Sequence, residues 1–268
     1  MAPWISGAVM GLAPPHLVGM TLAQSHLLVP VSKELSIDLL EAALPEQERF
    51  VEGALESTGA AEGDPYGVVL WPAAQVVAAA LLALLLRDGS RRRIVELGCG
   101  TGLCSLAAST VPKTVVLATD YRQEPLELLQ QAAVLNRERL QRTGAIETST
   151  ISTKCLDFTQ QAVPEADVIV AADLLYLRSA SEALARGCIA ALRTGSHILV
   201  GDSDRPGRQA FLSVLRSALR EDRGNFERLQ GWSLASPRHE LIASTSTSTT
   251  KPRALPVGLM YLQPDDLA

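Results

Sequence analysis

The stretch VELGCGTG, from Val95 to Gly102, constrains the fold of this chain more than any other feature of the sequence. An apolar run typical of a buried strand ends at an acidic residue, Glu96, and three glycines follow within five residues. A run of small and apolar residues, 102–110, then predicts a helix. A buried strand, a glycine turn and a helix start form the first unit of an open α/β sheet, in which ligands bind at the carboxyl ends of the strands.

Strand and helix patterns alternate along the rest of the chain. Continuous apolar runs, rather than alternating ones, predict strands that are buried on both faces of a parallel sheet. Two further strand patterns near the end of the chain have no helix between them, which predicts an antiparallel edge strand. The strand patterns are 93–98, 114–120, 151–158, 166–176, 196–204, 226–234 and 254–263, and the helix patterns are 72–86, 102–110, 124–140, 181–193 and 206–222. We therefore expect a Rossmann-like, seven-stranded, mostly parallel sheet with helices on both faces.

The N-terminal segment differs from the rest in composition. Residues 1–32 contain no Asp, Glu, Lys or Arg, a pattern typical of neither a secretory signal nor a mitochondrial transit peptide, and prolines in it disfavour a membrane span. Residues 33–62 are polar and rich in Glu, which predicts a helix or two. We expect 1–62 to form an N-terminal extension and 63–268 to form the main domain. A low-complexity loop is expected at 244–253.

Bulk composition narrows the function classes. The chain has 268 residues, of which 47% are hydrophobic and 20% charged, as in a globular protein that buries a core. A net charge of −5 makes nucleic acid an unfavoured partner. Four cysteines are present: Cys99, Cys104, Cys155 and Cys188. They lack the spacing of a zinc site, so we expect no bound metal. We expect reduced thiols in a cytoplasmic protein. The same observation leaves the nucleus and the mitochondrion open.

Two carboxylates distinguish this glycine loop from the loop of a dinucleotide-binding site. The G-x-G pattern alone does not distinguish them, because dehydrogenases and flavin enzymes share it. Glu96 lies two residues before the first glycine and would repel a pyrophosphate. Asp120 ends the next strand, about 20 residues further on, where a carboxylate commonly binds ribose hydroxyls. A ligand with a cationic amine, a ribose and no phosphate matches this set, which describes S-adenosylmethionine.

The sequence resembles the class I (seven-β-strand) S-adenosylmethionine-dependent methyltransferases. The segments VELGCGTG, ATD, LDF and DLLY carry the resemblance, together with LWPAAQVVAAAL upstream. These segments are most similar to the branch that contains protein-lysine methyltransferases, methyltransferase-like family 16. The resemblance covers about residues 65–225 and the last two strands.

The resemblance implies a set of site residues. Glu96, Gly98, Gly100 and Gly102 would line the methionine part of S-adenosylmethionine, and Asp120 would bind the ribose. Near the adenine would lie Asp157 and Phe158, and Trp71 would border the cofactor. At the methyl-acceptor end, Asp173 and Tyr176 are the expected catalytic residues.

Alternatives stay open at several positions. Asp120 can cap a helix, Asp157 can be an ordinary loop acid, and Trp71 and Tyr176 can be packing residues. Asp202 and Asp204 are expected to be solvated or capping residues.

Four functions compete at the level of the whole chain. The first is methyl transfer to a lysine of a protein substrate, and the second is N- or O-methylation of a small molecule. A third is a non-catalytic binding protein with a methyltransferase fold. Methylation of a nucleic-acid amine is disfavoured, because the prolines common after the fourth strand in such enzymes are replaced by Leu174 and Leu175.

Overall fold

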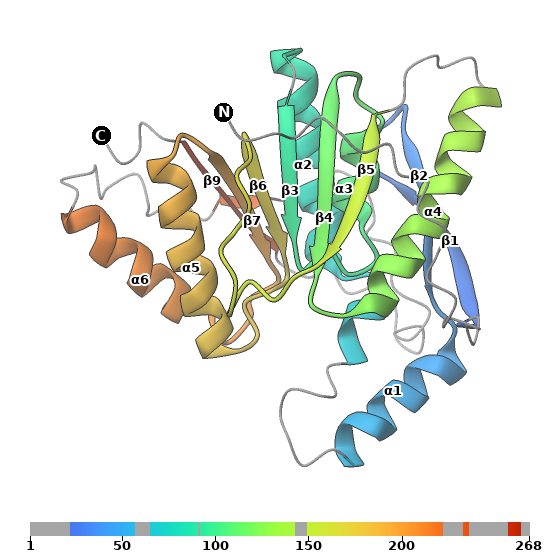
Figure 1. Cartoon of the computed structure of the whole chain (residues 1–268), viewed down its shortest axis with the longest axis horizontal. Coiled ribbons are helices and arrows are strands. Elements are labelled where there is room, and N and C mark those ends of the chain that lie inside the picture. Colours follow the sequence, from blue (N-terminus) through green and yellow to red (C-terminus); the bar gives the residue numbers. More distant parts are fainter. Residues whose placement is uncertain are drawn as a thin grey trace.

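The computed structural model describes residues 22–56, 65–90, 92–142, 149–221, 233–235 and 257–263. Its centre is a seven-stranded sheet with the order β5-β4-β3-β6-β7-β9-β8 (Figure 1). The strands are β3 (Arg92–Leu97), β4 (Thr114–Asp120), β5 (Thr150–Cys155), β6 (Val168–Ala172), β7 (His197–Asp202), β8 (Ser233–Ala235) and β9 (Val257–Leu262). The first five in spatial order are parallel, which confirms the expected mostly parallel sheet.

The last two strands form the expected antiparallel edge of the sheet. β9 pairs antiparallel with β7 on one side and with β8 on the other, so β8 is the edge strand. The connection that carries the chain to this edge begins after α6, and the apolar strand β9 returns beside β7, where both of its neighbours are strands. The 244–253 loop prediction falls outside the described residues.

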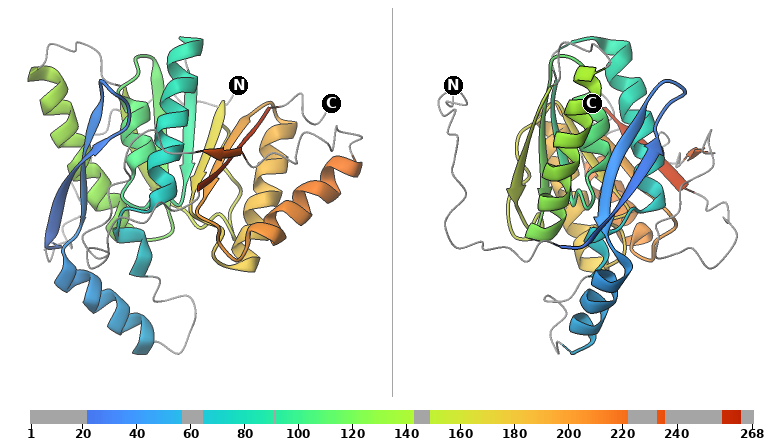
Figure 2. Two further views of the ribbon diagram at one scale, coloured as in Figure 1. Left: turned by 180° about the vertical axis from the view of Figure 1, so that it is seen from behind. Right: turned by 90° about the vertical axis from the view of Figure 1, so that its right-hand side faces the viewer.

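Helices cover both faces of the sheet. On one face, α2 (Pro72–Asp88), α3 (Leu103–Ser109) and α4 (Gln123–Arg142) share a hydrophobic core with Ile94 of β3. On the other face, α5 (Arg178–Arg193) and α6 (Arg208–Glu221) pack on Val95 and Leu97. Neighbouring strand residues therefore point into different cores, as alternation along a strand requires, and the layers can be followed in Figure 2.

The ends of α2 follow the signals in its sequence. Pro72 occupies the first helical turn, where its missing N–H costs nothing, and Gly89 ends the helix with φ 63° while its N–H donates to the Leu85 carbonyl oxygen. The predicted helix after Trp71 is confirmed. The start of this helix lies at the site described below, where Ala73 contacts Asp173 and Trp71 contacts Arg205.

The N-terminal region contains a hairpin that the sequence analysis missed. β1 (Gln24–Pro30) pairs antiparallel with β2 (Ser36–Ala42), and α1 (Leu44–Glu56) follows. The expected helix within 33–62 is confirmed by α1, and the strand at 36–42 was not predicted. Ile37 and Leu39 of β2 are fully buried in the core that also holds α4.

Polar contacts join the hairpin to α4. Asn136, which is 3% exposed, donates to the Asp38 carbonyl oxygen at 2.6 Å and accepts from the Asp38 N–H at 2.9 Å. Arg139 adds an ion pair to the Asp38 carboxylate. This tertiary contact, which no local pattern reveals, explains why SIDLLEA is a strand despite its helix-forming leucines and glutamate.

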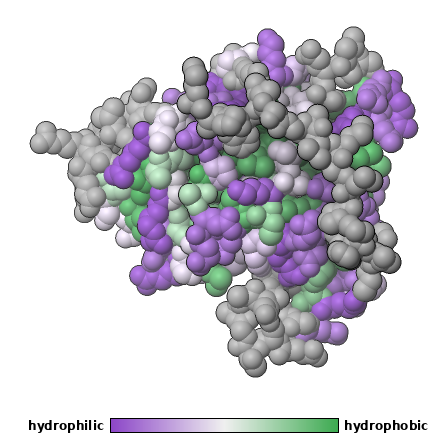
Figure 3. All heavy atoms as spheres, in the orientation of Figure 1, coloured by the Kyte–Doolittle hydropathy of each residue, from purple (hydrophilic) through white to green (hydrophobic). Residues whose placement is uncertain are grey.

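No described helix has the length and apolar character needed to cross a membrane. Hydrophilic residues are spread over the face shown in Figure 3, with hydrophobic residues visible between them.

Candidate functional site

The carboxyl ends of β3, β4, β5, β6 and β7 meet at one edge of the sheet, because these strands are parallel. This edge carries the glycine loop and most of the acidic residues that the sequence singled out. The 3₁₀ helix η1 (Pro65–Val68) and helix α1 lie beyond this edge (Figure 1). Segments from three parts of the chain therefore converge on the place where open α/β sheets bind ligands.

The glycine loop adopts a backbone that side chains disfavour. Gly98, Gly100 and Gly102 have φ values of 54°, 51° and 79°. A Cβ atom at Gly98 would lie 2.5 Å from Leu174 Cδ2, and one at Gly102 would lie 2.3 Å from Leu129 Cδ1. At Gly100 it would lie 3.2 Å from the Gly67 carbonyl oxygen of η1. The space opposite each glycine is taken by protein, so these glycines are required by backbone conformation and packing.

Glu96 is buried at the end of β3, with 2% of its surface exposed. Its Oε2 accepts from the Ser105 N–H at 2.8 Å and from the Ser105 hydroxyl at 2.5 Å, which ties the end of the strand to helix α3. Burial raises the pKa of Glu96 to about 7, although hydrogen bonds from Ser105 and Cys104 lower it. The nearby Asp120 carboxylate raises it further. Glu96 is thus a buried acid that titrates near neutral pH.

Asp120 ends β4 and is 4% exposed. Its Oδ2 accepts from the Gly100 N–H at 3.0 Å, so the glycine loop and the second strand end are directly connected. Its Oδ1 accepts from the Arg122 N–H, which is the contact of a residue that begins a turn into α4. The Arg122 guanidinium lies over the Phe50 ring of α1, 5.2 Å from its centroid, and this contact brings α1 to the edge.

The structure gives Asp157 and Phe158 local partners. Leu156 donates its N–H to the Asp120 carbonyl oxygen, so the segment after β5 starts beside Asp120. Asp157 Oδ1 accepts from the N–H and the hydroxyl of Thr159, and Phe158 packs against the core on the α5 side. The half-buried Asp157 carboxylate therefore closes a turn, and the predicted role of both residues near adenine stays a prediction.

Asp173 follows β6 and is surrounded by hydrogen-bond donors. Its Oδ1 accepts from the Ser203 N–H and hydroxyl, at 2.9 and 2.6 Å, and from Arg205 Nε at 3.2 Å. Its Oδ2 accepts from the Ala73 N–H at 3.1 Å. Asp173 has a φ of 58° and 5% exposure, so one buried carboxylate joins the ends of β6 and β7 to the start of α2.

Trp71 is half-buried immediately before α2. Its indole N–H donates to the Tyr66 carbonyl oxygen at 2.7 Å, and the Tyr66 ring meets it edge-on with centroids 5.7 Å apart. The Arg205 guanidinium carbon lies 4.5 Å from the centroid of the Trp71 ring. Arg205 therefore links Trp71 to Asp173, because its guanidinium contacts both the Trp71 ring and the Asp173 carboxylate.

Tyr176 and Asp202 differ from each other and from Asp173 in exposure. Tyr176 is 37% exposed in the turn before α5, whereas Asp173 is buried. Of the two alternatives for Asp202, solvated or capping, the structure excludes the first, because Asp202 is fully buried and pairs with Arg208 Nε at 2.6 Å. Its carboxylate accepts from the Arg205 N–H, three residues further on, as a capping carboxylate does. Burial raises the pKa of Asp202, while the Arg208 hydrogen bond lowers it. Asp204 is exposed and pairs with Arg208.

One hydrogen bond directly joins two predicted site residues, Gly100 and Asp120, and Arg205 contacts both Trp71 and Asp173. The structure also reveals residues that the sequence analysis missed. Ser105, Ser203, Arg205 and Arg122 each contact a predicted site residue. Polar residues also follow β7, in the segment GDSDRPGR. Their position at the end of a parallel strand could have indicated Ser203 and Arg205 as site residues. Their partners could be found only from the fold.

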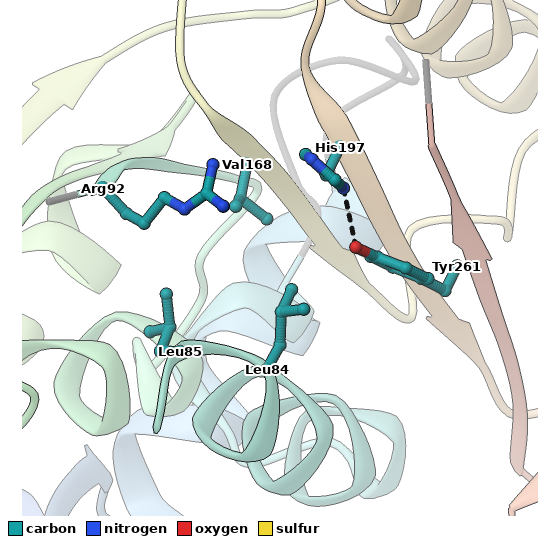
Figure 4. Close-up of a pocket in the computed structure, with 6 residues that line it drawn as sticks. All are labelled: Leu84, Leu85, Arg92, Val168, His197 and Tyr261. Atoms are coloured by element: carbon teal, nitrogen blue, oxygen red, sulfur yellow. Dashed lines mark hydrogen bonds between the residues drawn. The ribbon is translucent and has the colours of Figure 1, made fainter. Parts of the chain in front are cut away.

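Two cavities lie away from this edge. A cavity of about 10 Å³ lies at the opposite end of the strands, where His197 Nδ1 and the Tyr261 hydroxyl are 2.6 Å apart (Figure 4). Figure 4 shows Leu84 and Leu85 of α2 on one side of it and Arg92 and Val168 on the other. A groove of about 370 Å³ runs between residues 158–165 and α5. Neither is lined by Glu96, Asp120 or Asp173.

The chain is similar to known methyltransferases in sequence. A family model described as lysine methyltransferase matches residues 56–218, which is more than half of the chain. The electron transfer flavoprotein beta subunit lysine methyltransferase of Xenopus laevis is 29% identical over 164 residues, 58% of this chain and 58% of that protein. The protein of the same name from Danio rerio is 28% identical over 153 residues, 55% and 52% of the two chains. The chain thus aligns with between half and three-fifths of the length of these relatives.

Two solved structures with some likeness to this chain have TM-scores near 0.4. TrmN from Thermus thermophilus has a TM-score of 0.41 and 24% identity, covering 68% of this chain and 48% of its own. The ribosomal protein L11 methylase from Lactobacillus delbrueckii subsp. bulgaricus has a TM-score of 0.42 and 16% identity, covering 65% and 79%. The family match spans the glycine loop and all the acids at the carboxyl edge. The chain belongs to the lysine methyltransferase family.

Proposed function

We propose that this chain is an S-adenosylmethionine-dependent methyltransferase that transfers a methyl group to a lysine of a protein substrate. The observation that carries the proposal is the family match over residues 56–218, which contains all ten predicted site residues. These are Trp71, Glu96, Gly98, Gly100, Gly102, Asp120, Asp157, Phe158, Asp173 and Tyr176. The contacts among them support the proposal.

The chemistry of the glycine loop fits S-adenosylmethionine. Residues 98–102 include no lysine or arginine that could pair with a phosphate, and two buried carboxylates, Glu96 and Asp120, stand beside the loop. A cationic ligand without phosphate is compatible with this charge, whereas a pyrophosphate is not. In the proposed complex, Glu96 and the glycine loop hold the methionine part and Asp120 the ribose. Asp157, Phe158 and Trp71 complete the binding site.

The reaction requires little acid–base chemistry from the protein. The bound cofactor supplies a methyl group on a sulfonium, which is already an electrophile. The chain must orient the acceptor amine and let it lose its proton before it attacks. We assign the orienting role to Asp173 and Tyr176. The four donors on the Asp173 carboxylate support a positioning role for it, because they fix its direction.

The names of the relatives suggest the class of substrate. Both are lysine methyltransferases of the beta subunit of electron transfer flavoprotein, a protein. We therefore propose a protein substrate, with that subunit as the first candidate to test. We propose that residues 1–62 form an N-terminal extension and that residues 63–268 form the methyltransferase domain. The four free cysteines support a reducing compartment such as the cytoplasm.

The direct test is transfer of a labelled methyl group. Purified chain is incubated with methyl-labelled S-adenosylmethionine and either purified electron transfer flavoprotein beta subunit or a cell lysate. Labelled bands are then digested and mapped by mass spectrometry. We expect methylated lysine. At a low S-adenosylmethionine concentration we expect Asp120→Ala to reduce the label, whereas Asp167→Ala, at the opposite end of the sheet, retains it. Label confined to small molecules would identify a small-molecule methyltransferase, and no label would favour a binding protein.

A further inference from the structure

We propose that Arg205 occupies the acceptor site of the unliganded protein and that the lysine of the substrate displaces its guanidinium. This inference rests on the proposed function and adds a residue that determines specificity. Arg205 lies between β7 and α6, in a segment for which the family resemblance assigned no role. Its side chain stands between the two predicted site residues that can recognise a cation, Trp71 and Asp173.

Trp71 and Asp173 together form a corner suited to a cation. The Trp71 ring offers an aromatic face, and the guanidinium carbon of Arg205 lies 4.5 Å from its centroid. The Asp173 carboxylate offers a negative charge, and Arg205 Nε lies 3.2 Å from its Oδ1. A cation that contacts an aromatic face and a carboxylate at once gains from both interactions. The protonated form of a lysine side chain has the same two requirements.

The corner remains in place when the arginine leaves. Three neutral donors, the N–H and hydroxyl of Ser203 and the N–H of Ala73, hold the Asp173 carboxylate. Trp71 is held through its indole N–H by the Tyr66 carbonyl oxygen. Departure of Arg205 therefore requires no rearrangement of either residue.

Arg205 can leave by a movement of its side chain alone. Its backbone N–H donates to the buried Asp202 carboxylate, which fixes the main chain at this position. The side chain is 26% exposed, so it reaches the protein surface. A long, flexible side chain at a partly exposed position can exchange one rotamer for another.

The arrangement predicts selection for a cationic acceptor. A neutral hydroxyl can donate to the Asp173 carboxylate, but neither it nor an apolar group brings the positive charge that replaces the guanidinium. A lysine brings a positive charge to Asp173 before its amine is deprotonated for attack. Competition with Arg205 therefore sets the apparent affinity for lysine and excludes neutral side chains.

The test measures cation binding directly, without the cofactor. A protein with Trp4→Phe and Trp232→Phe retains Trp71 as its single tryptophan, and its fluorescence is followed during titration with n-butylammonium chloride. We expect Arg205→Met to bind n-butylammonium about 10-fold more tightly than the protein with Arg205, since the competing cation is gone. Arg205→Gln should show the same change. Butanol, which carries no charge, should give none.

Arg93→Met is the matched control. Arg93 pairs with Asp167 at the opposite end of the sheet, so its loss also removes an Arg–Asp contact but leaves the corner unchanged. Equal or weaker n-butylammonium binding by both Arg205 variants would overturn the proposal. If neither variant folds, NMR of the protein with Arg205 decides: saturation with n-butylammonium should move the Arg205 Nε–H signal toward that of a solvated arginine, and an unmoved signal would overturn it.

The result is independent of the proposed function. Absence of methyl transfer together with the expected increase in n-butylammonium binding would contradict the enzyme assignment and retain the corner. Methyl transfer together with unchanged n-butylammonium binding would support the enzyme assignment and contradict the proposed role of Arg205. In an active enzyme, Arg205→Met should lower KM for a lysine peptide, and this change separates competition for the site from a loss of stability.

Discussion

Glu96 lies in an environment unlike that of an exposed glutamate. The sequence predicted an acid that lines the methionine part of the cofactor, and the structure buries its carboxylate against Ser105. In the unfolded chain its pKa is 4.5, and burial raises it to about 7 in the native protein. Between these two values the native state holds a proton that the unfolded state has lost.

The sign of the pH dependence follows from this difference. The stabilisation from the bound proton is complete below pH 4.5 and is lost as the pH rises through 7, so the free energy of unfolding falls by on the order of 3 kcal/mol over that interval. Glu96→Gln does not titrate and should lose this component. Urea unfolding of both proteins at pH 5 and pH 8 measures it. Parallel pH curves for the two proteins would show that Glu96 titrates normally.

Asp173 is a second residue for which the fold changes the expectation. The sequence suggested a residue that contacts substrate alone, and the structure also connects it to Ala73, Ser203 and Arg205. Asp173→Asn should therefore reduce the free energy of unfolding by about 2–4 kcal/mol, because it leaves Arg205 unpaired and turns an amide donor toward one of the donors. Asparagine tolerates the φ of 58°, so backbone strain adds little.

Chemical denaturation provides the measurement, with Asp167→Asn as the control at a half-exposed position. A change below 0.5 kcal/mol for Asp173→Asn would mean that the hydrogen bonds around this carboxylate contribute little to folding. Loss of methyl transfer in this variant must be compared with its stability, since both depend on the same contacts.

Residue types and order were readable from the sequence, but their partners were not. The positions of Glu96, Asp120 and Asp173 at strand ends follow from local patterns. That Glu96 contacts Ser105 depends on how α3 packs against the end of β3, and that Asp202 pairs with Arg208 depends on how α6 follows β7. The contact of Arg205 with Trp71 depends on how segments distant in the chain pack together.

At the scale of the elements, the strand-to-helix turn around Gly102 is the most constrained segment. Gly102 has a φ of 79°, and a Cβ there would overlap Leu129 of α4. Gly89, after α2, has a φ of 63° with no atom within 4 Å of its Cβ position. Both glycines therefore have a left-handed backbone conformation that would strain another residue, but only Gly102 is closely packed.

This pair predicts two different substitution costs. Gly89→Ala should destabilise by about 1 kcal/mol, the cost of a left-handed alanine. Gly102→Ala should destabilise by at least about 2 kcal/mol, because α4 must shift as well. Thermal or urea unfolding of both variants provides the comparison. Equal costs at the two positions would show that Leu129 adapts without loss.

The predictability of the elements depended on local signals. α2 was predictable because Pro72 and Gly89 mark its ends, and the parallel strands because their apolar runs are continuous. The β1–β2 hairpin was not, because β2 is held by Asn136 and Arg139 of α4. The order of the last two strands was not either, since a sequence pattern gives strands and not their neighbours.

At the scale of the whole molecule, parallel strands bring loops from distant positions to one edge. The family match, the glycine loop and the two carboxylates point to one kind of ligand there. The groove beside α5 and the cavity at His197 lie elsewhere. The central claim is therefore that this edge binds S-adenosylmethionine, and methyl transfer depends on it.

Calorimetric titration of the purified chain with S-adenosylmethionine tests that claim most directly, with NAD as the comparison ligand. We predict micromolar binding of S-adenosylmethionine and no heat with NAD. Asp120→Ala should weaken binding by about 1–3 kcal/mol, whereas Asp167→Ala should leave it unchanged. Absence of S-adenosylmethionine binding by a folded protein, or equal binding of NAD, would contradict the account.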